Sequence, residues 1–326
     1  MEEGELHRGV FPPLFHYLSV VIHNTCIMIF PSKLQQGDLV RIISPAGKVN
    51  PALVHAGAEI IRSWGLRVDI APNALSEAGR FAADPEARRN DLVEALMDPD
   101  VKAVFCSRGG YGAVQLLRQL PVGLVRMRPK WLVGYSDVTL LHAFWNRESI
   151  ISLHAPMCAH LAEFPANGAT LALRNLLFGK RVAYEIPAHS FNRTGKVRGR
   201  LRGGNLAVMC GLRGTQFDFN YQDTILFIED IAEQPYKIER MLFQLYLGGV
   251  FDVIAGLVVG QFTECPEDPG MTGSVYGIIR NFTDRFDFPV CFDFPVGHVE
   301  DNRPLPVGAM AELKVTPKGV TLEVLK

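Results

Sequence analysis

The chain has 326 residues, 48% hydrophobic and 21% charged, with 33 Lys and Arg against 34 Asp and Glu. This length allows one large domain or two ordinary domains with substantial cores. The hydrophobic content and the net charge of −1 exclude a mainly disordered chain and give no overall field for nucleic acid or an anionic membrane. We therefore expect a small or nearly neutral partner, or none.

The sequence carries no sign of a membrane span or of export. No segment approaches the roughly 20 apolar residues that a membrane helix needs, and the acidic start Met1–Glu5 differs from a secretory signal. The six cysteines stand singly, with no C-x-x-C pair, which is typical of buried thiols in a reducing compartment rather than of a metal site. We expect a cytoplasmic protein without a metal.

The first 30 residues lack clear periodicity, and the regular pattern begins near Pro31. We interpret residues 1–30 as an N-terminal extension, with Met28 as an alternative start of translation. A genuine arm that packs on the body or on a partner subunit is the other interpretation.

From residue 31 to residue 150, short apolar strands alternate with helices. The pattern predicts strands at 39–43, 66–70, 103–106 and 131–134, and helices at 51–65, 84–97, 113–119 and 137–146. Asp84 followed by Pro85 is a typical helix start, with a side-chain acceptor at the cap and Pro in the first turn. Repeated βα units of this length predict a parallel sheet covered by helices on both faces.

The pattern weakens over 151–189, where we expect a link between domains with one helix at 169–178. Residues 190–326 resume with strands at 224–228, 254–259 and 290–294, a helix at 235–247 and a hairpin at 311–324. We therefore divide the chain into an extension (1–30), an N-terminal domain (31–150), a linker (151–189) and a C-terminal domain (190–326).

The first candidate for chemistry is Ser136, in Gly134-Tyr135-Ser136-Asp137. It sits where a buried strand meets a helix, which is the geometry of a nucleophile elbow, and the N–H of Asp137 could face an oxyanion. The letters do not match G-x-S-x-G, since Val138 replaces the second Gly. The alternative is that Ser136 only caps the helix.

A glycine-rich loop, Arg108-Gly109-Gly110-Tyr111-Gly112, follows another buried strand. Its glycines allow the backbone to approach a ligand closely, but it matches neither G-x-G-x-x-G nor the P-loop. An oxyanion-binding loop and a plain turn are equally compatible with it.

Glu229 and Asp230 follow an apolar strand, where a carboxylate needs a partner and could orient an imidazole. Alternatively, Asp230 or Glu233 serves the start of the next helix. His298 follows a strand, with Gly297 before it and acids after it, and is the histidine with the most site-like surroundings, although a lone His is usually structural. His142, His154 and His160 lack such surroundings and match no zinc motif.

Ser136, Glu229 and His298 each lie at or after the carboxyl end of a predicted strand, where α/β folds place their sites. Spacing alone does not show that they meet, so the residues favour a Ser–His–acid hydrolase only modestly.

Taken in order, these motifs resemble the LD-carboxypeptidase (muramoyltetrapeptide carboxypeptidase) family of serine peptidases, whose relatives include microcin C immunity proteins. The resemblance runs from about Pro31 to the C-terminus and is carried by Ser44-Pro45, Arg108 to Gly112, Gly134 to Asp137, Gly203 to Leu206, Leu226 to Asp230 and Gly297-His298. The first 30 residues have no counterpart in it.

The resemblance implies a flavodoxin-like N-terminal α/β domain, a smaller C-terminal α/β domain and an active site in the groove between them. It implies Ser136 as nucleophile, His298 as base and Glu229 as the orienting acid. The oxyanion hole would use the N–H of Asp137 with that of Gly109 or Gly110. It also implies a homodimer that uses no metal or other cofactor.

The activity implied is release of terminal D-Ala from cytoplasmic murein tetrapeptide during cell-wall recycling, with Arg108 as our candidate for the substrate carboxylate. Two alternatives remain at this point. One is the same chemistry on a peptidyl-nucleotide amide, as in microcin C immunity, and the other is a muropeptide-binding protein without turnover. A nucleic-acid or membrane partner is not expected.

Overall fold

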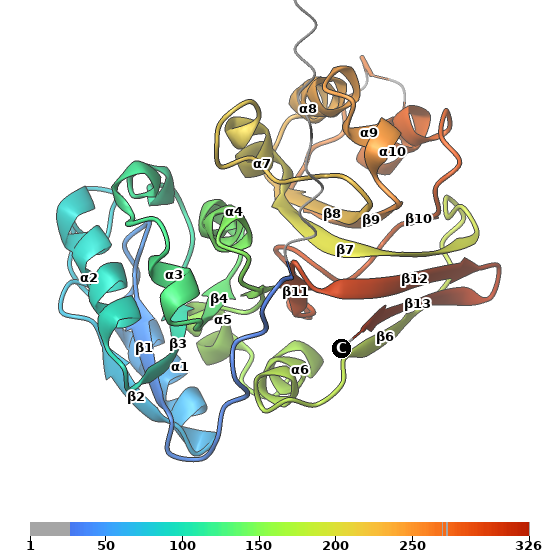
Figure 1. The fold of residues 1–326 in the computed structure, drawn as a ribbon. Helices are drawn as coiled ribbons and strands as arrows, with labels where there is room; N and C mark the ends of the chain where they lie inside the picture. The colour runs from blue at the N-terminus through green and yellow to red at the C-terminus, as the bar shows by residue number, and fades with distance from the viewer. Residues whose placement is uncertain (1–26, 269, 272, 326) are drawn as a thin grey trace, which may run out of the picture.

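The computed structural model describes residues 27–268, 270–271 and 273–325. Two mixed α/β halves, each built on one sheet, lie side by side (Figure 1). The predicted fold class, a parallel N-terminal sheet followed by a second α/β part, is confirmed. Within the described ranges, no helix is long and apolar enough to cross a membrane.

The first sheet has six strands in the order β11-β5-β4-β3-β1-β2. All neighbours are parallel except β11, which runs antiparallel to β5. The order 2-1-3-4-5 of the parallel strands is that of flavodoxin-like folds, which bind ligands beyond the carboxyl ends of the strands. The strands are β1 (Leu39–Ile43), β2 (Arg67–Ile70), β3 (Val101–Cys106), β4 (Trp131–Gly134), β5 (Ser152–His154) and β11 (Leu305–Val307).

The helices of the first half begin largely where the sequence predicts. Asp84 caps α2 by accepting a hydrogen bond from the N–H of Ala87 at 2.8 Å. The helix predicted up to Gln119 is wrong, because the chain forms two single 3₁₀ turns there, Ala113–Gln115 and Leu117–Gln119. Gly112, with φ of 136°, and Pro121 confine this segment to eight residues, and neither turn has a side-chain cap. The helices are α1 (Pro51–Ser63), α2 (Pro85–Met97), α3 (Leu124–Met127), α4 (Thr139–Arg147) and α5 (Cys158–Glu163).

The second sheet has seven strands in the order β10-β9-β8-β7-β12-β13-β6. The strands β7 to β10 are parallel, and β12, β13 and β6 continue the sheet as antiparallel neighbours, with the predicted hairpin formed by β12 and β13. Helices α7 to α10 lie on one side of the parallel strands (Figure 1). The elements are α6 (Gly168–Leu177), β6 (Ala183–Ile186), β7 (Gly195–Asn205), α7 (Leu206–Leu212), β8 (Thr224–Ile231), α8 (Pro235–Leu247), α9 (Val250–Val253), β9 (Gly256–Thr263), α10 (Val275–Thr283), β10 (Val290–Cys291), β12 (Met310–Thr316) and β13 (Gly319–Val324).

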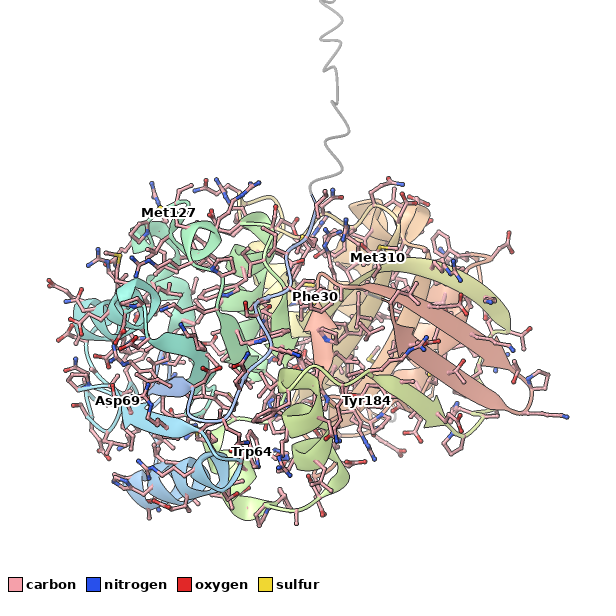
Figure 2. All side chains as sticks on the ribbon, turned by 60° about the horizontal axis from the view of Figure 1, so that its bottom comes forward. Phe30, Trp64, Asp69, Met127, Tyr184 and Met310 are labelled. Atoms are coloured by element: carbon pink, nitrogen blue, oxygen red, sulfur yellow. The ribbon has the colours of Figure 1, made fainter. Side chains whose placement is uncertain are left out.

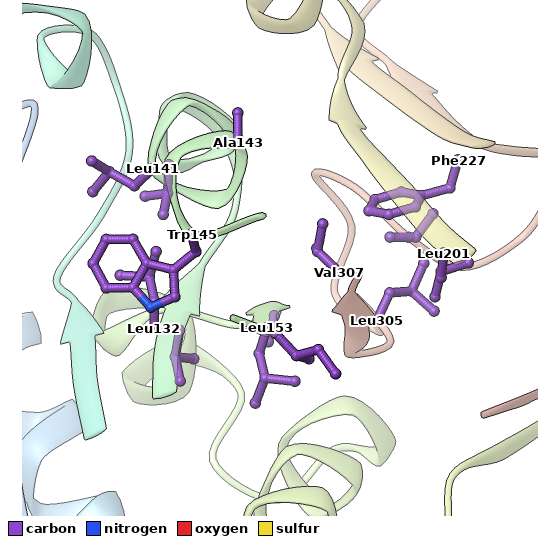
Figure 3. Close-up of a cluster of buried hydrophobic side chains, with 14 of the residues drawn as sticks. Leu132, Leu141, Ala143, Trp145, Leu153, Leu201, Phe227, Leu305 and Val307 are labelled. Atoms are coloured by element: carbon purple, nitrogen blue, oxygen red, sulfur yellow. The ribbon is translucent and has the colours of Figure 1, made fainter. Parts of the chain in front are cut away.

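Strand β11 connects the two halves. After β10, which has two residues rather than the five predicted, the chain crosses to the first sheet, forms β11 and returns as β12. Leu305 and Val307 are fully buried, and Figure 3 shows them between Leu153 of the first sheet and Leu201 of the second. One continuous hydrophobic core therefore runs through both halves.

The segments at the proposed domain boundaries pack on the body. Within the predicted linker, β5 pairs with β4 and so extends the first sheet. Most of the predicted extension, residues 1–26, lies outside the described residues. Ile29 pairs with Ile150, and the Phe30 ring packs edge-on against Trp131, near the boundary between the halves (Figure 2).

Candidate active site

Ser136 lies at the turn between β4 and α4, at the carboxyl edge of the first sheet. Its φ of +65° is unusual for a residue with a side chain and costs on the order of 1 kcal/mol or more. The absent side chain of Gly134 makes room for the turn, since a Cβ there would lie 2.9 Å from Val138. The Ser136 hydroxyl makes no helix-cap hydrogen bond, so the capping alternative is not the arrangement found.

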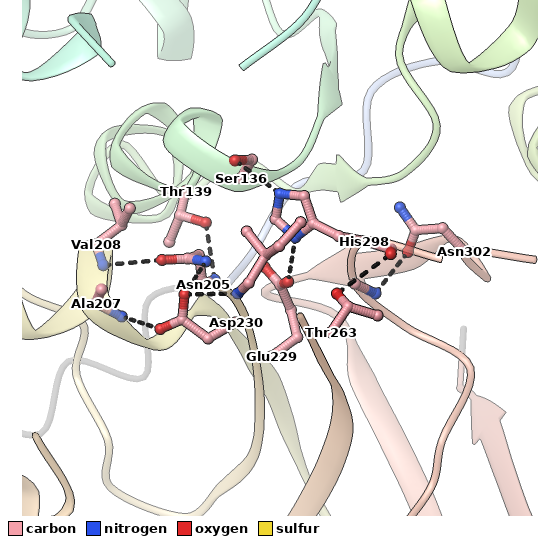
Figure 4. A network of polar contacts seen from close by, with 12 residues as sticks. Ser136, Thr139, Asn205, Ala207, Val208, Glu229, Asp230, Thr263, His298 and Asn302 are labelled. Carbon is pink, nitrogen blue, oxygen red and sulfur yellow. Dashed lines mark hydrogen bonds and ion pairs between the residues drawn. The ribbon is translucent and has the colours of Figure 1, made fainter. Parts of the chain in front are cut away.

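The structure brings Ser136, His298 and Glu229 into one hydrogen-bonded chain (Figure 4). Nδ1 of His298 lies 2.8 Å from Oε2 of Glu229, and Nε2 lies 3.0 Å from Oγ of Ser136. When Nδ1 carries the ring proton and donates it to Glu229, Nε2 is free to accept from the Ser136 hydroxyl. Glu229 is fully buried, and its other oxygen, Oε1, has no hydrogen-bond partner among the described residues.

The surroundings of His298 favour its protonated form. Burial lowers the pKa of His298, but the hydrogen bond and charge of Glu229, with the charges of Asp230 and Glu264, raise it. The raising effects prevail, so the pKa of His298 lies above its ordinary value. Gly297, at φ of +125°, permits this approach, because a Cβ there would lie 2.9 Å from Oε2 of Glu229.

The neighbouring carboxylate, Asp230, has a structural position. Strand β8 continues to Ile231, so Glu229 and Asp230 lie inside a strand rather than after it, where the pairing of β8 with β9 is irregular. Asp230 accepts hydrogen bonds from Nδ2 of Asn205 (2.8 Å) and from the N–H of Ala207 (2.9 Å). It thus supports the start of α7 rather than the helix that follows β8. Burial raises the pKa of Asp230 to about 6.

The glycine-rich loop after β3 lies directly against Ser136. A Cβ on Gly109 would come within 2.9 Å of the Ser136 Cβ and 3.3 Å of the backbone nitrogen of Asp137. The buried side chain of Asp137 accepts a hydrogen bond from the N–H of Ala113 at 2.8 Å and so ties this loop to the Ser136 turn. Burial raises the pKa of Asp137 to about 6, although the hydrogen bonds that its carboxylate accepts from the loop backbone lower the pKa.

Sequence analysis missed Arg88 of α2, which hydrogen-bonds to the glycine-rich loop after β3. Arg88 is almost completely buried, and its guanidinium donates to the carbonyl oxygens of Pro45 (2.7 Å) and Gly112 (3.1 Å) and to the side chain of Gln115. A buried arginine on a helix carries no distinctive sequence pattern. Only the fold shows that it joins the loops after β1 and β3.

A pocket of about 190 Å³ opens onto Ser136 and His298. The lining includes Arg108, Gly109 and Gly110 of the glycine-rich loop, which sequence analysis had selected as candidates. The side chain of Arg108 is exposed and donates a hydrogen bond to the carbonyl oxygen of Lys48. Helix α5 supplies side chains that sequence analysis had set aside or not considered. The lining residues are Arg108, Gly109, Gly110, Tyr135, Ser136, Met157, Ala159, His160, Glu163 and His298.

His142, His154 and His160 lie near the site without joining the hydrogen bonds between Ser136, His298 and Glu229. The ring of Tyr135 contacts those of His154, His160 and His298, with centroids 5.9, 6.1 and 5.0 Å apart. His142 is fully buried and bonds to Ser152 and to the Gly134 carbonyl oxygen. Among the described residues, no group of His, Cys, Asp and Glu side chains could hold a metal ion.

A serine, a histidine and a buried carboxylate in hydrogen-bonded series, with glycine backbone beside the serine, define the class of serine hydrolases. The family models for the N- and C-terminal domains of LD-carboxypeptidases match residues 40–155 and 198–313. The chain belongs to the LD-carboxypeptidase family and is a serine-type hydrolase, as the resemblance in the sequence implied.

Individual relatives agree with this assignment. The murein tetrapeptide carboxypeptidase of Pseudomonas aeruginosa is 30% identical over 84% of this chain and 92% of its own. The crystal structure of muramoyltetrapeptide carboxypeptidase from Oxalobacter formigenes, also 30% identical, covers 88% of this chain and 99% of its own with a TM-score of 0.82. The microcin C7 self-immunity protein MccF in complex with aspartyl sulfamoyl adenosine, 21% identical, shares the fold with a TM-score of 0.82, covering 90% of this chain and 98% of its own.

Proposed function

We propose that this protein is a serine carboxypeptidase that releases terminal D-Ala from murein tetrapeptide in the cytoplasm during peptidoglycan recycling. The bond cut would join the L-configured centre of the diamino acid to D-Ala. The observation that carries the proposal is the hydrogen-bonded series Ser136–His298–Glu229 at the pocket. The names of the relatives from P. aeruginosa and O. formigenes support the substrate.

In the proposed mechanism, the Ser136 hydroxyl attacks the carbonyl carbon of the bond to D-Ala. His298 takes the hydroxyl proton at Nε2 and then gives it to the leaving amino group, which releases D-Ala and leaves an acyl-enzyme. Water, activated by His298, then frees Ser136. Glu229 keeps the imidazole in the required tautomer and stabilises its charged form, which fits the raised pKa of His298.

The negative charge that develops on the substrate oxygen needs hydrogen-bond donors in place before the reaction. We assign this role to the backbone N–H of Asp137 and to that of Gly109 or Gly110, because the glycine loop packs directly on the Ser136 turn. Such a donor contributes on the order of 3 kcal/mol to the stability of the transition state. Arg108, exposed at the same pocket, is our candidate for binding a substrate carboxylate.

We further propose the division into an N-terminal domain (31–150), a linker (151–189) and a C-terminal domain (190–326), supported by the two separate family matches. A homodimer and a cytoplasmic location complete the proposal. Sedimentation equilibrium of the full chain and cell fractionation test these two points, and a monomer or a membrane-bound protein would contradict them.

The test of function is D-Ala release from murein tetrapeptide by wild type and by Ser136→Ala, with pentapeptide as a second substrate. We expect release from tetrapeptide only, lost in Ser136→Ala. Release that survives in Ser136→Ala would contradict the assignment of the nucleophile. A folded wild type that spares the tetrapeptide but cleaves a peptidyl-nucleotide amide would favour the immunity-type reaction instead.

A further inference from the structure

We propose that Glu163 determines specificity by binding a positively charged group of the substrate, the free amino group on the side chain of the diamino acid beside the cleaved bond. The inference rests on the proposed function, because it assigns a contact within the same peptide substrate. It makes the enzyme selective for peptides whose penultimate residue carries an unmodified amine.

Glu163 belongs to the same pocket as Ser136 and His298. It is the last residue of α5, and Ala159 and His160 of the same helix also line the pocket. The helix therefore forms one wall of the space in which the substrate must lie, and its C-terminal end presents the Glu163 carboxylate there.

The position of Glu163 is unfavourable for a residue with a structural role. The C-terminus of a helix carries partial negative charge, so this end favours Lys, Arg or His and disfavours a carboxylate. Glu163 is exposed, and its carboxylate makes no hydrogen bond or ion pair with any described residue. In contrast, Glu148 accepts a hydrogen bond from the N–H of Gly123 (2.7 Å), and Glu233 pairs with Lys237 (3.5 Å). The carboxylate of Glu163 is thus free to pair with a ligand.

The pocket presents charges of both signs. Arg108 lines it from the loop after β3 and Glu163 from α5. Burial is the main cause that raises the pKa of the Tyr135 hydroxyl, followed by the charge of Glu229; the charge of Glu163 adds to this and that of Arg108 opposes it. A carboxypeptidase substrate must carry a carboxylate, and the diamino acid adds an ammonium group. Such a peptide can satisfy both charges, whereas an acylated or uncharged side chain would leave Glu163 without a partner.

The experiment compares two substrates, murein tetrapeptide with a free side-chain amine and the same peptide with that amine acetylated. Wild type, Glu163→Gln, Glu163→Asp and the control Glu185→Gln are assayed for kcat and KM. Glu185, on the edge strand β6, is exposed and lies outside the pocket. Glu185→Gln therefore makes the same change in net charge as Glu163→Gln without altering the pocket. Circular dichroism confirms that each variant is folded.

We expect wild type to prefer the free amine by about tenfold or more in kcat/KM, the worth of one charge-assisted hydrogen bond. Glu163→Gln should lose most of this preference through a higher KM for the free-amine peptide, with the acetylated peptide unaffected. Glu163→Asp should retain part of it, and Glu185→Gln all of it.

Two results would overturn the inference while leaving the proposed function intact. One is a wild type that releases D-Ala equally well from both peptides. The other is a Glu163→Gln variant that keeps the preference or slows both substrates equally. A wild type that releases D-Ala from neither peptide would overturn the proposed function, and the inference with it.

Discussion

Replacing Glu229 by Gln tests the electrostatic argument for the site directly. The change removes one negative charge and keeps the shape of a fully buried side chain whose Oε2 lies 2.8 Å from Nδ1 of His298. We expect a folded protein with very low activity, because the imidazolium that forms during the reaction loses its charged partner.

The magnitude follows from Coulomb's law. With about 4 Å between the charge centres and an effective dielectric constant of about 20, the attraction between imidazolium and carboxylate is about 4 kcal/mol. Since about 1.4 kcal/mol of barrier corresponds to a factor of ten in rate, kcat should fall by about 10³-fold. The same loss should lower the pKa of His298 from its raised value.

The assay is the pH profile of kcat/KM for D-Ala release. Because the proposed mechanism requires a neutral imidazole as the base, wild-type activity should rise with pH through the raised pKa of His298. In Glu229→Gln this rise should move to lower pH while the plateau falls. A folded variant that keeps activity within tenfold of wild type, or whose profile moves to higher pH, would refute the argument.

Three further predictions concern stability and the glycine loop. Ser136→Gly should be more stable than Ser136→Ala by about 1 kcal/mol in urea unfolding, because glycine relieves the strain at φ of +65°, and equal stabilities would contradict this. Gly109→Ala should lose at least about 100-fold in kcat and should melt at a lower temperature, since its Cβ would lie 2.9 Å from the Ser136 Cβ, and full activity would show that the loop can move away. Burial lowers the pKa of His142 to about 4, so in acid the unfolded chain takes up the proton first. The stability of wild type relative to His142→Asn should then fall by about 3 kcal/mol between about pH 6.5 and 4, because the variant keeps every other titrating group. A difference in stability that does not change with pH would contradict this.

The sequence indicated the three side chains of the proposed triad, but their meeting depends on the fold. Ser136 was recognisable from the abrupt change between an apolar strand and a helix, and Glu229 from a carboxylate in an apolar strand. Nothing in the chain shows that residues 162 positions apart, Ser136 and His298, come within 3.0 Å. That proximity requires the carboxyl edges of two sheets to face each other.

Other features gave too weak a pattern for prediction. Strands β5 and β11 have three residues each, too few to show alternation, and Pro306 inside β11 argues against a strand. His160 and Glu163 occupy a helix of six residues, too short for a clear periodicity. These elements owe their conformation to tertiary pairing and packing rather than to local preference.

The path of β11 makes the enzyme depend on its complete chain. Along the chain, β1 to β5 belong to the first sheet, β6 to β10 to the second, β11 to the first again, and β12 and β13 to the second. No single chain break therefore separates the protein into two complete sheets. A chain still being synthesised would already hold Ser136 in a nearly complete sheet, but it would lack both His298 and the strand that closes the edge at β5. Peptidase activity should therefore appear only once synthesis has passed residue 307 and β11 has paired with β5.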